Sequence, residues 1–194
     1  MHNAVNWASW LFWGFGSTLA LTTVLAGSQG LGLTRMNLPY MLGTILTPNR
    51  DRARFYGFGL HVFAGWVFSL LYVLAFGFLG RENWWLGALF GVAHGLFVLV
   101  VGVAMLPGLH PRMANEQHGP SATRELEPPG FLALNYGIRT PISILVSHAV
   151  FGAMLGLPTD SFDDNPELIA LFFLQSAEDR SLRQGWCQPG HARE

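Results

Sequence analysis

The positions of the charged residues constrain this chain more than any other feature. Four stretches contain no Asp, Glu, Lys or Arg, and they cover residues 1–34, 55–80, 83–111 and 140–159. Each is about 20 residues or longer, which lets a helix cross ~30 Å of hydrocarbon at 1.5 Å per residue. Charged residues make up only 12% of the chain, against about a quarter in soluble domains. The sequence therefore predicts an integral membrane protein.

The charge-free stretches predict an all-α fold, a four-span transmembrane helical bundle over residues 1–158. The expected spans are residues 7–27, 56–79, 84–107 and 142–157. The fourth is the shortest, because sixteen helical residues rise only about 24 Å. Residues 81–83 alone separate the second and third spans, which predicts a tight antiparallel helical hairpin.

Two polar regions complete the expected domain organisation. Residues 36–49 are uncharged but too short to span a bilayer, and their two prolines favour an interfacial or re-entrant segment. The polar C-terminal tail, residues 159–194, is expected to be either disordered or a short interfacial helix that Asn165 would cap.

Arginine counting predicts the orientation in the membrane. The first and third loops hold seven arginines within reach of a span, whereas the opposite side holds only Arg81. The seven are Arg35, Arg50, Arg52, Arg54, Arg112, Arg124 and Arg139. The positive-inside rule then places both long loops in the cytoplasm and both termini outside. Arg50, Arg52 and Arg54 directly precede a span, which predicts that they anchor the chain to anionic lipid headgroups.

Several function classes are not supported by the sequence. A net charge of −1 gives no electrostatic case for binding nucleic acid. The single cysteine, Cys187, excludes an internal disulfide. The sequence contains neither a phosphate-binding loop nor a nucleophile elbow, and this favours a non-enzymatic protein.

Small residues recur at helical spacing on three of the expected spans. Their positions are four residues apart and therefore lie on one helix face, which permits close helix packing in lipid. The glycines expected to pack against other helices are Gly65, Gly87, Gly91, Gly95, Gly152 and Gly156. If these faces are exposed, they would mediate association with a membrane partner or a second copy of the chain.

A faint internal repeat accompanies these small-residue faces. Gly-Leu-Thr-Arg-Met at 32–36 matches Gly-Leu-His-Pro-Arg-Met at 108–113, and a His-x-x-x-Gly motif follows each of them. These motifs begin at His61 and at His148. The pattern suggests two tandem helical hairpins related by an axis along the membrane normal, although chance matches between short glycine-containing motifs remain an alternative.

Three histidines lie within the expected spans and on small-residue faces. Counted from the arginine-rich side, His61 and His148 lie about 6–9 Å deep and His94 roughly 20 Å deep. Imidazoles that face the interior of a bundle can bind a cofactor such as haem, a divalent metal or protons. The alternative is that they hydrogen-bond to neighbouring helices and only fix the packing.

A second histidine group lies in the loop after the third span. His110, Glu116 and His118 offer two imidazoles and one carboxylate within nine residues. These are donors that a divalent metal ion accepts. We therefore include them as candidate metal ligands.

Several short motifs occur together in one order along residues 20–157. They are Leu-Thr-Arg-Met-Asn-Leu-Pro at 33–39, Leu-Gly-Thr at 42–44, Asn-Arg-Asp-Arg at 49–52, Leu-His-Pro-Arg-Met at 109–113 and Glu-Pro-Pro-Gly-Phe at 127–131. In these motifs the chain resembles a group of small bacterial four-helix integral membrane proteins of unassigned function. The resemblance implies a four-helix fold in a bacterial inner membrane. It implies no particular reaction.

Three functional hypotheses follow from the sequence. The first is a non-enzymatic accessory or assembly subunit that packs through its glycine-faced helices. The second is a histidine-ligated haem or metal protein, for which a redox role in the membrane would be suitable. The third is a small transporter or proton-relay element, in which histidines alone would carry the protons because no expected span contains Asp, Glu, Lys or Arg.

Overall fold

The computed structural model describes residues 7–115 and 117–157, which belong to one compact unit that ends at Leu157. Every regular element within these residues is a helix. The predicted tail at 159–194, with its short helix after Asn165, lies outside the described residues.

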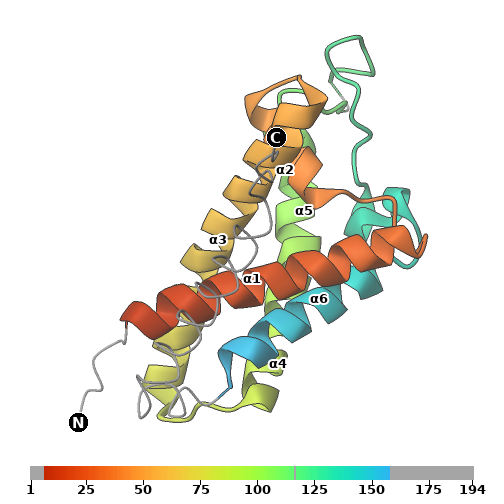
Figure 1. The fold of residues 1–194 in the computed structure, drawn as a ribbon. Helices are drawn as coiled ribbons and strands as arrows, with labels where there is room; N and C mark the ends of the chain where they lie inside the picture. Colours follow the sequence, from red (N-terminus) through yellow and green to blue (C-terminus); the bar gives the residue numbers. More distant parts are fainter. Residues whose placement is uncertain (1–6, 116, 158–194) are drawn as a thin grey trace, which may run out of the picture. The chain divides into compact units, whose positions relative to one another are not determined.

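The described residues form six α-helices, one π-helix and one 3₁₀-helix (Figure 1). In chain order they are α1 (Trp7–Gly30), α2 (Leu38–Leu46), α3 (Arg50–Leu79), α4 (Trp84–Phe97), the π-helix η1 (Val98–Gly102), α5 (Val103–Leu109), the 3₁₀-helix η2 (Phe131–Tyr136) and α6 (Thr140–Leu155). The elements α4, η1 and α5 follow one another without a break.

Three of these helical stretches are long and apolar enough to cross a membrane. They are Ser9–Gly30, Arg50–Leu79 and Trp84–Leu109. The helix α6 is apolar but has only 16 residues. The structure therefore confirms an all-helical chain with three membrane-spanning candidates, and the fourth span stays a prediction.

Asparagine caps set the beginnings of α2, α3 and α4. The side chain of Asn49 accepts hydrogen bonds from the backbone N–H groups of Asp51 and Arg52, so α3 begins at Arg50. The sequence placed this start at Tyr56, because the charged residues before it lower the hydropathy. Charged residues continue a helix freely once its first N–H groups are capped. The apolar span is therefore shorter than the helix that contains it.

The helices surround one core in the order α3, α1, α6, α4. Figure 1 shows α1 running alongside α6, and α6 in turn packs most extensively against α4. The tight α3–α4 hairpin expected from the short connection is not confirmed: the two helices meet through aromatic side chains and not through close backbone contact. Tyr72 and Phe76 of α3 lie against Phe90 of α4 at ring-centroid distances of 6.2 and 5.6 Å. Large rings hold the two backbones apart.

Glycines bring α4 and α6 into backbone contact. A Cβ atom added to Gly91 would lie 2.1 Å from the carbonyl oxygen of His148, and one added to Gly152 would lie 2.0 Å from the carbonyl oxygen of Gly87. A Cβ on Gly156 would meet the carbonyl oxygen of Asn83 at 2.3 Å. No side chain fits between the helices at these glycines, which explains why small residues occur on both faces.

The contact between α1 and α3 uses the same kind of surface. A Cβ added to Gly65 would lie 2.0 Å from the hydroxyl of Thr18, and one added to Gly14 would lie 2.6 Å from the hydroxyl of Ser69. His61, Gly65 and Ser69 on α3 thus have the spacing of His148, Gly152 and Gly156 on α6. Gly65 and Ser69 face α1, as Gly152 and Gly156 face α4.

The π-helix in the third span was not predicted. It covers Val98–Gly102, where the N–H of Val103 bonds to the carbonyl of Val98. Pro107 follows within α5 and has no N–H to donate, so the regular ladder is already interrupted there. Such π-bulges often occur at functional sites, and this one begins four residues after His94.

The segment predicted to be interfacial or re-entrant contains the helix α2, which packs on the first turns of α3. Asn37 caps it, and Pro39 occupies its first turn. A Cβ added to Gly43 would lie 1.6 Å from the carbonyl oxygen of Ala53. The backbones of α2 and α3 are therefore in direct contact.

Candidate functional site

Three histidines from three helices come together in the core of the bundle. We call His61 of α3, His94 of α4 and His148 of α6 the histidine cluster. The rings of His94 and His148 meet edge to face with their centroids 4.8 Å apart. His61 is buried on α3, which contacts α6, the helix that carries His148. Its exposed fraction is 8% and that of His148 is 5%, so both rings face the protein interior.

The hydrogen bonds of the cluster indicate which nitrogens are available. Nδ1 of His148 lies 2.8 Å from the carbonyl oxygen of Ile144, so this nitrogen carries the proton and donates it. The Nε2 atom of His148 is then the nitrogen that carries a lone pair. Nδ1 of His94 lies 3.2 Å from the hydroxyl of Tyr72. Nε2 of His61 is buried and has no hydrogen-bond partner among the described residues.

Aromatic rings enclose the cluster. The ring of Phe68 lies on His94 at a centroid distance of 4.3 Å, and Phe151 lies 6.2 Å from the same imidazole. A small cavity of about 20 Å³ adjoins His148 and is lined mainly by apolar side chains such as Leu25 and Val98. That volume accommodates about one water molecule. The imidazoles therefore occupy an almost dry environment.

The depths estimated from the sequence are wrong for His94. It was expected about 10 Å deeper than His148, yet the two rings touch. The estimate assumed that all helices end at one level on the arginine-rich side. The third span continues to Leu109 over 26 residues, whereas α6 has only 16 and begins at Thr140. Helices of such different length do not begin at a common level, so residue counts do not give a shared depth.

The geometry also limits what the cluster can bind. Bis-histidine haem ligation places the iron and the macrocycle between two imidazoles, and the edge-to-face contact of His94 with His148 leaves no room for them. Among the residues that the structure describes, no three His, Cys, Asp or Glu side chains are arranged to hold a metal ion.

The predicted loop ligands lie in different surroundings. His110 is buried with an exposed fraction of 2%, whereas His118 is exposed at the surface. Glu116 lies outside the described residues. The two imidazoles that were predicted to bind one metal ion therefore lie in different environments, one buried and one exposed.

Both ring nitrogens of His110 are occupied by protein groups. Nδ1 accepts the backbone N–H of Arg112 at 3.1 Å, so Nε2 carries the proton and faces the carbonyl oxygen of Met41 at 3.0 Å. The hydroxyl of Thr44 lies 3.3 Å from the same nitrogen. Burial lowers the pKa of His110 below its ordinary value, the Met41 carbonyl opposes this effect, and the Arg112 charge adds to it. His110 is therefore a neutral side chain that joins its loop to α2.

The loop that follows α1 reaches across to the opposite half of the chain, which the sequence did not reveal. The hydroxyls of Thr34 and Thr140 lie 2.7 Å apart, and the N–H of Arg35 donates to the carbonyl of Tyr136 at 2.8 Å. His110 and Arg112 make the corresponding contacts from the second half to α2. The loop after α1 therefore contacts the segment that precedes α6, and the loop after α5 contacts α2, which precedes α3. The matching Arg-Met motifs were the only signal in the sequence.

The predicted lipid anchor is exposed. Arg50, Arg52 and Arg54 lie in the first turns of α3 and are accessible to solvent. The guanidinium carbon of Arg50 lies 5.9 Å from the centroid of the Tyr40 ring. These cations can therefore reach groups outside the bundle.

Comparison with known proteins does not identify a family for the chain. No family model matches the sequence, and no significant match was found among curated proteins or solved structures.

Proposed function

We propose that the chain is an integral membrane protein that relays protons through the histidine cluster. The observation that carries this proposal is the convergence of His61, His94 and His148 from three helices. Imidazoles within a membrane are costly to bury and commonly mark proton or ion pathways. The length and apolar character of three helices support the membrane assignment.

The hydrogen-bond arrangement suits proton transfer. A neutral imidazole accepts a proton on one nitrogen and releases the other proton from its second nitrogen. Nε2 of His148 carries the free lone pair, and the ring centroid of His94 lies 4.8 Å from that of His148. Tyr72 adds a hydroxyl that can exchange a proton with Nδ1 of His94. The small cavity beside His148 reaches Met36 and Leu38, which follow α1, so it extends from the cluster toward the loop side.

The orientation and location form part of the proposal. The arginine-rich loops lie on the cytoplasmic face of a cell inner membrane, and both termini lie on the other face. Arg50, Arg52 and Arg54 contact anionic headgroups there. The helix α6 serves as a fourth, short span.

The accessory-subunit hypothesis now needs a different contact surface. The glycines that would have mediated association are occupied within the chain, since Gly87 and Gly91 face α6 and Gly65 faces α1. A partner protein or a second copy would have to bind a lipid-facing surface instead. The proton hypothesis has a defined set of groups, and we therefore prefer it.

Proton flux into liposomes tests the proposal. The full chain is reconstituted with a pH-sensitive dye inside the vesicles, and a potassium diffusion potential drives protons inward. We expect a flux that is lost when His61, His94 and His148 are replaced together by Gln, and that is retained in the matched variant His118→Gln. Flux that survives the triple replacement would rule the proposal out.

Absorption spectra and metal analysis of the same preparation address the cofactor hypothesis. A Soret band, or one equivalent of bound metal that the triple replacement abolishes, would assign the cluster to ligand binding in place of proton transfer.

A further inference from the structure

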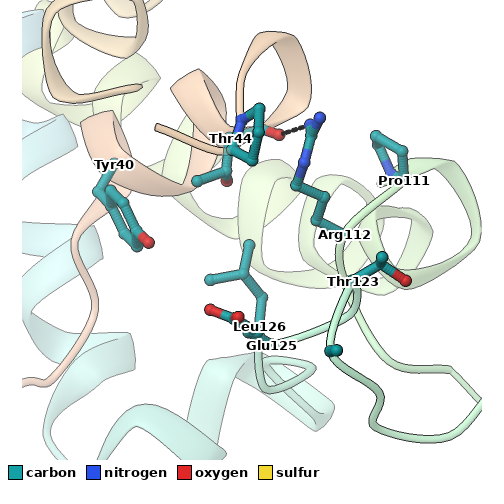
Figure 2. Close-up of a pocket in the computed structure, with 9 residues that line it drawn as sticks. Tyr40, Thr44, Pro111, Arg112, Thr123, Glu125 and Leu126 are labelled. Carbon is teal, nitrogen blue, oxygen red and sulfur yellow. Dashed lines mark hydrogen bonds between the residues drawn. The ribbon is translucent and has the colours of Figure 1, made fainter. Parts of the chain in front are cut away.

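A second cavity lies at the arginine-rich end of the chain, away from the histidine cluster. Its volume is about 340 Å³, and it opens between α2 and the loop after α5. Tyr40 and Thr44 of α2 form one wall, and Arg112, Glu125 and Leu126 form another (Figure 2). The cavity therefore combines a cation, a carboxylate and apolar surface.

The two charges in this cavity do not neutralise each other. The guanidinium of Arg112 turns toward the end of α2 and donates to the carbonyl oxygens of Thr44 and Ile45, as Figure 2 shows for Thr44. Within the part of the chain that the structure describes, neither Arg112 nor Glu125 forms an ion pair. A guanidinium has five N–H donors, so Arg112 keeps donors for a ligand after serving these two carbonyls.

The place of the cavity suggests where such a ligand comes from. Arg112 follows directly on the end of the span Trp84–Leu109, and Pro48 lines the cavity just before the span Arg50–Leu79. The boundary of the spans is the level at which phospholipid headgroups lie. Tyr40 contributes an aromatic side chain of the kind that is enriched at this level.

We propose that this cavity binds the zwitterionic headgroup of a phospholipid that carries a primary ammonium. The phosphate faces Arg112 and the ammonium faces Glu125, so that one ligand satisfies both unpaired charges. Charge-assisted bonds of this kind are about twice as strong as neutral ones. A headgroup with only a negative charge would leave Glu125 unpaired beside it, and the site therefore discriminates against anionic lipids. This distinguishes the cavity from the cluster of Arg50, Arg52 and Arg54, which attracts anionic lipids.

Native mass spectrometry of the full chain tests the proposal. The protein is released from nanodiscs that contain equal amounts of phosphatidylethanolamine, phosphatidylcholine and phosphatidylglycerol. The abundances of the three lipid adducts are then compared. We expect the phosphatidylethanolamine adduct to dominate. Glu125→Gln should reduce its preference over phosphatidylglycerol about tenfold or more, because the ammonium loses its charged partner. Glu82→Gln is the matched control, since Glu82 lies in the connection between α3 and α4 and does not line the cavity, and it should keep the preference.

Arg112 also holds the end of α2, so its removal can disturb the fold. Arg112→Lys keeps the positive charge and is expected to retain the adduct, whereas Arg112→Gln is expected to lose it. A preference for phosphatidylethanolamine that is unchanged in Glu125→Gln would overturn the proposal. A preference of the unmodified chain for phosphatidylglycerol would do so as well.

A soluble compound with the same charges is tested separately. The full chain in lipid-free detergent is titrated with glycerophosphoethanolamine by calorimetry. Binding of this probe without any enrichment of the lipid in nanodiscs would assign the cavity to a soluble zwitterion and overturn the lipid proposal. Weak binding of the probe together with strong lipid enrichment is the expected result.

Discussion

The imidazole of His94 lies edge to face against that of His148, with the ring centroids 4.8 Å apart, although the two residues belong to different helices. This contact exists because Gly91 and Gly95, on the same face of α4, admit the backbone and side chain of His148. Glycine packing and histidine chemistry therefore depend on each other. The small residues position the imidazoles.

The hydrogen bond between Tyr72 and His94 should be visible by spectroscopy. Replacing Tyr72 with Phe removes the hydroxyl that lies 3.2 Å from Nδ1 of His94. We expect the side-chain ¹⁵N resonances of His94 to shift in solid-state NMR spectra of the protein in lipid, while those of His118 remain in place. Unchanged His94 resonances would show that the hydrogen bond does not form.

Close packing between α4 and α6 should make Gly91 intolerant of any side chain. The Cβ of Gly91→Ala would lie 2.1 Å from the carbonyl oxygen of His148, so the helices must separate. We expect the free energy of unfolding to fall by about 1–3 kcal/mol. Thermal unfolding in detergent, followed by circular dichroism, measures this effect.

Gly59→Ala is the matched control for Gly91→Ala. Gly59 also lies within a long helix, and a Cβ there meets nothing within 4 Å. Its unfolding temperature should equal or exceed that of the unmodified chain. If the two variants were equally stable, α4 and α6 would not be in backbone contact.

The neutral state of His110 predicts a dependence of stability on pH. Its pKa in the folded chain is lowered, chiefly by burial, so the unfolded chain binds the additional proton first as the pH falls. Stability contributed by the neutral ring is therefore present above about pH 6.5 and is lost as the pH falls toward the folded pKa. We expect the loss of unfolding temperature between pH 7.5 and pH 5 to be smaller in His110→Gln than in the unmodified chain. An identical pH dependence in both proteins would contradict this description of His110.

The crossing of the first loop to α6 can be captured covalently. The hydroxyls of Thr34 and Thr140 are 2.7 Å apart and buried, so cysteines at both positions should form a disulfide under a membrane-permeant oxidant. The measurement is a shift in gel mobility in a chain that also carries Cys187→Ser. Cysteines at Thr34 and Ser147 provide the control, since Ser147 lies almost two helical turns further along α6. Crosslinking of the control pair, but not of the first pair, would contradict the arrangement.

The sequence predicted those features that depend on local patterns. Missing charges located the three long apolar helices, and the small-residue spacing identified the face on which His148 lies. The first residues of helices were harder to predict. The helix α3 begins directly after its cap residue Asn49 and not where the charged residues end. Caps act on a few N–H groups and leave hydropathy unchanged.

The packing of one helix against another could not be predicted from the sequence. The short connection at 81–83 suggested that α3 and α4 form a tight hairpin, yet the glycines of α4 face α6 while aromatic rings fill the space toward α3. The contact between His94 and His148 was missed for a related reason, since helix lengths differ and residue counts do not give a common depth. Such contacts depend on which faces pair, and periodicity alone does not specify the partner.

Proton flux in single-site variants tests the central claim most directly. If the histidine cluster conducts protons in series, then His94→Gln and His148→Gln should each reduce the flux into liposomes nearly to that of protein-free vesicles. His118→Gln, at the exposed loop, should leave it unchanged. Wild-type flux in both cluster variants, or no flux above protein-free vesicles in the unmodified chain, would contradict the account.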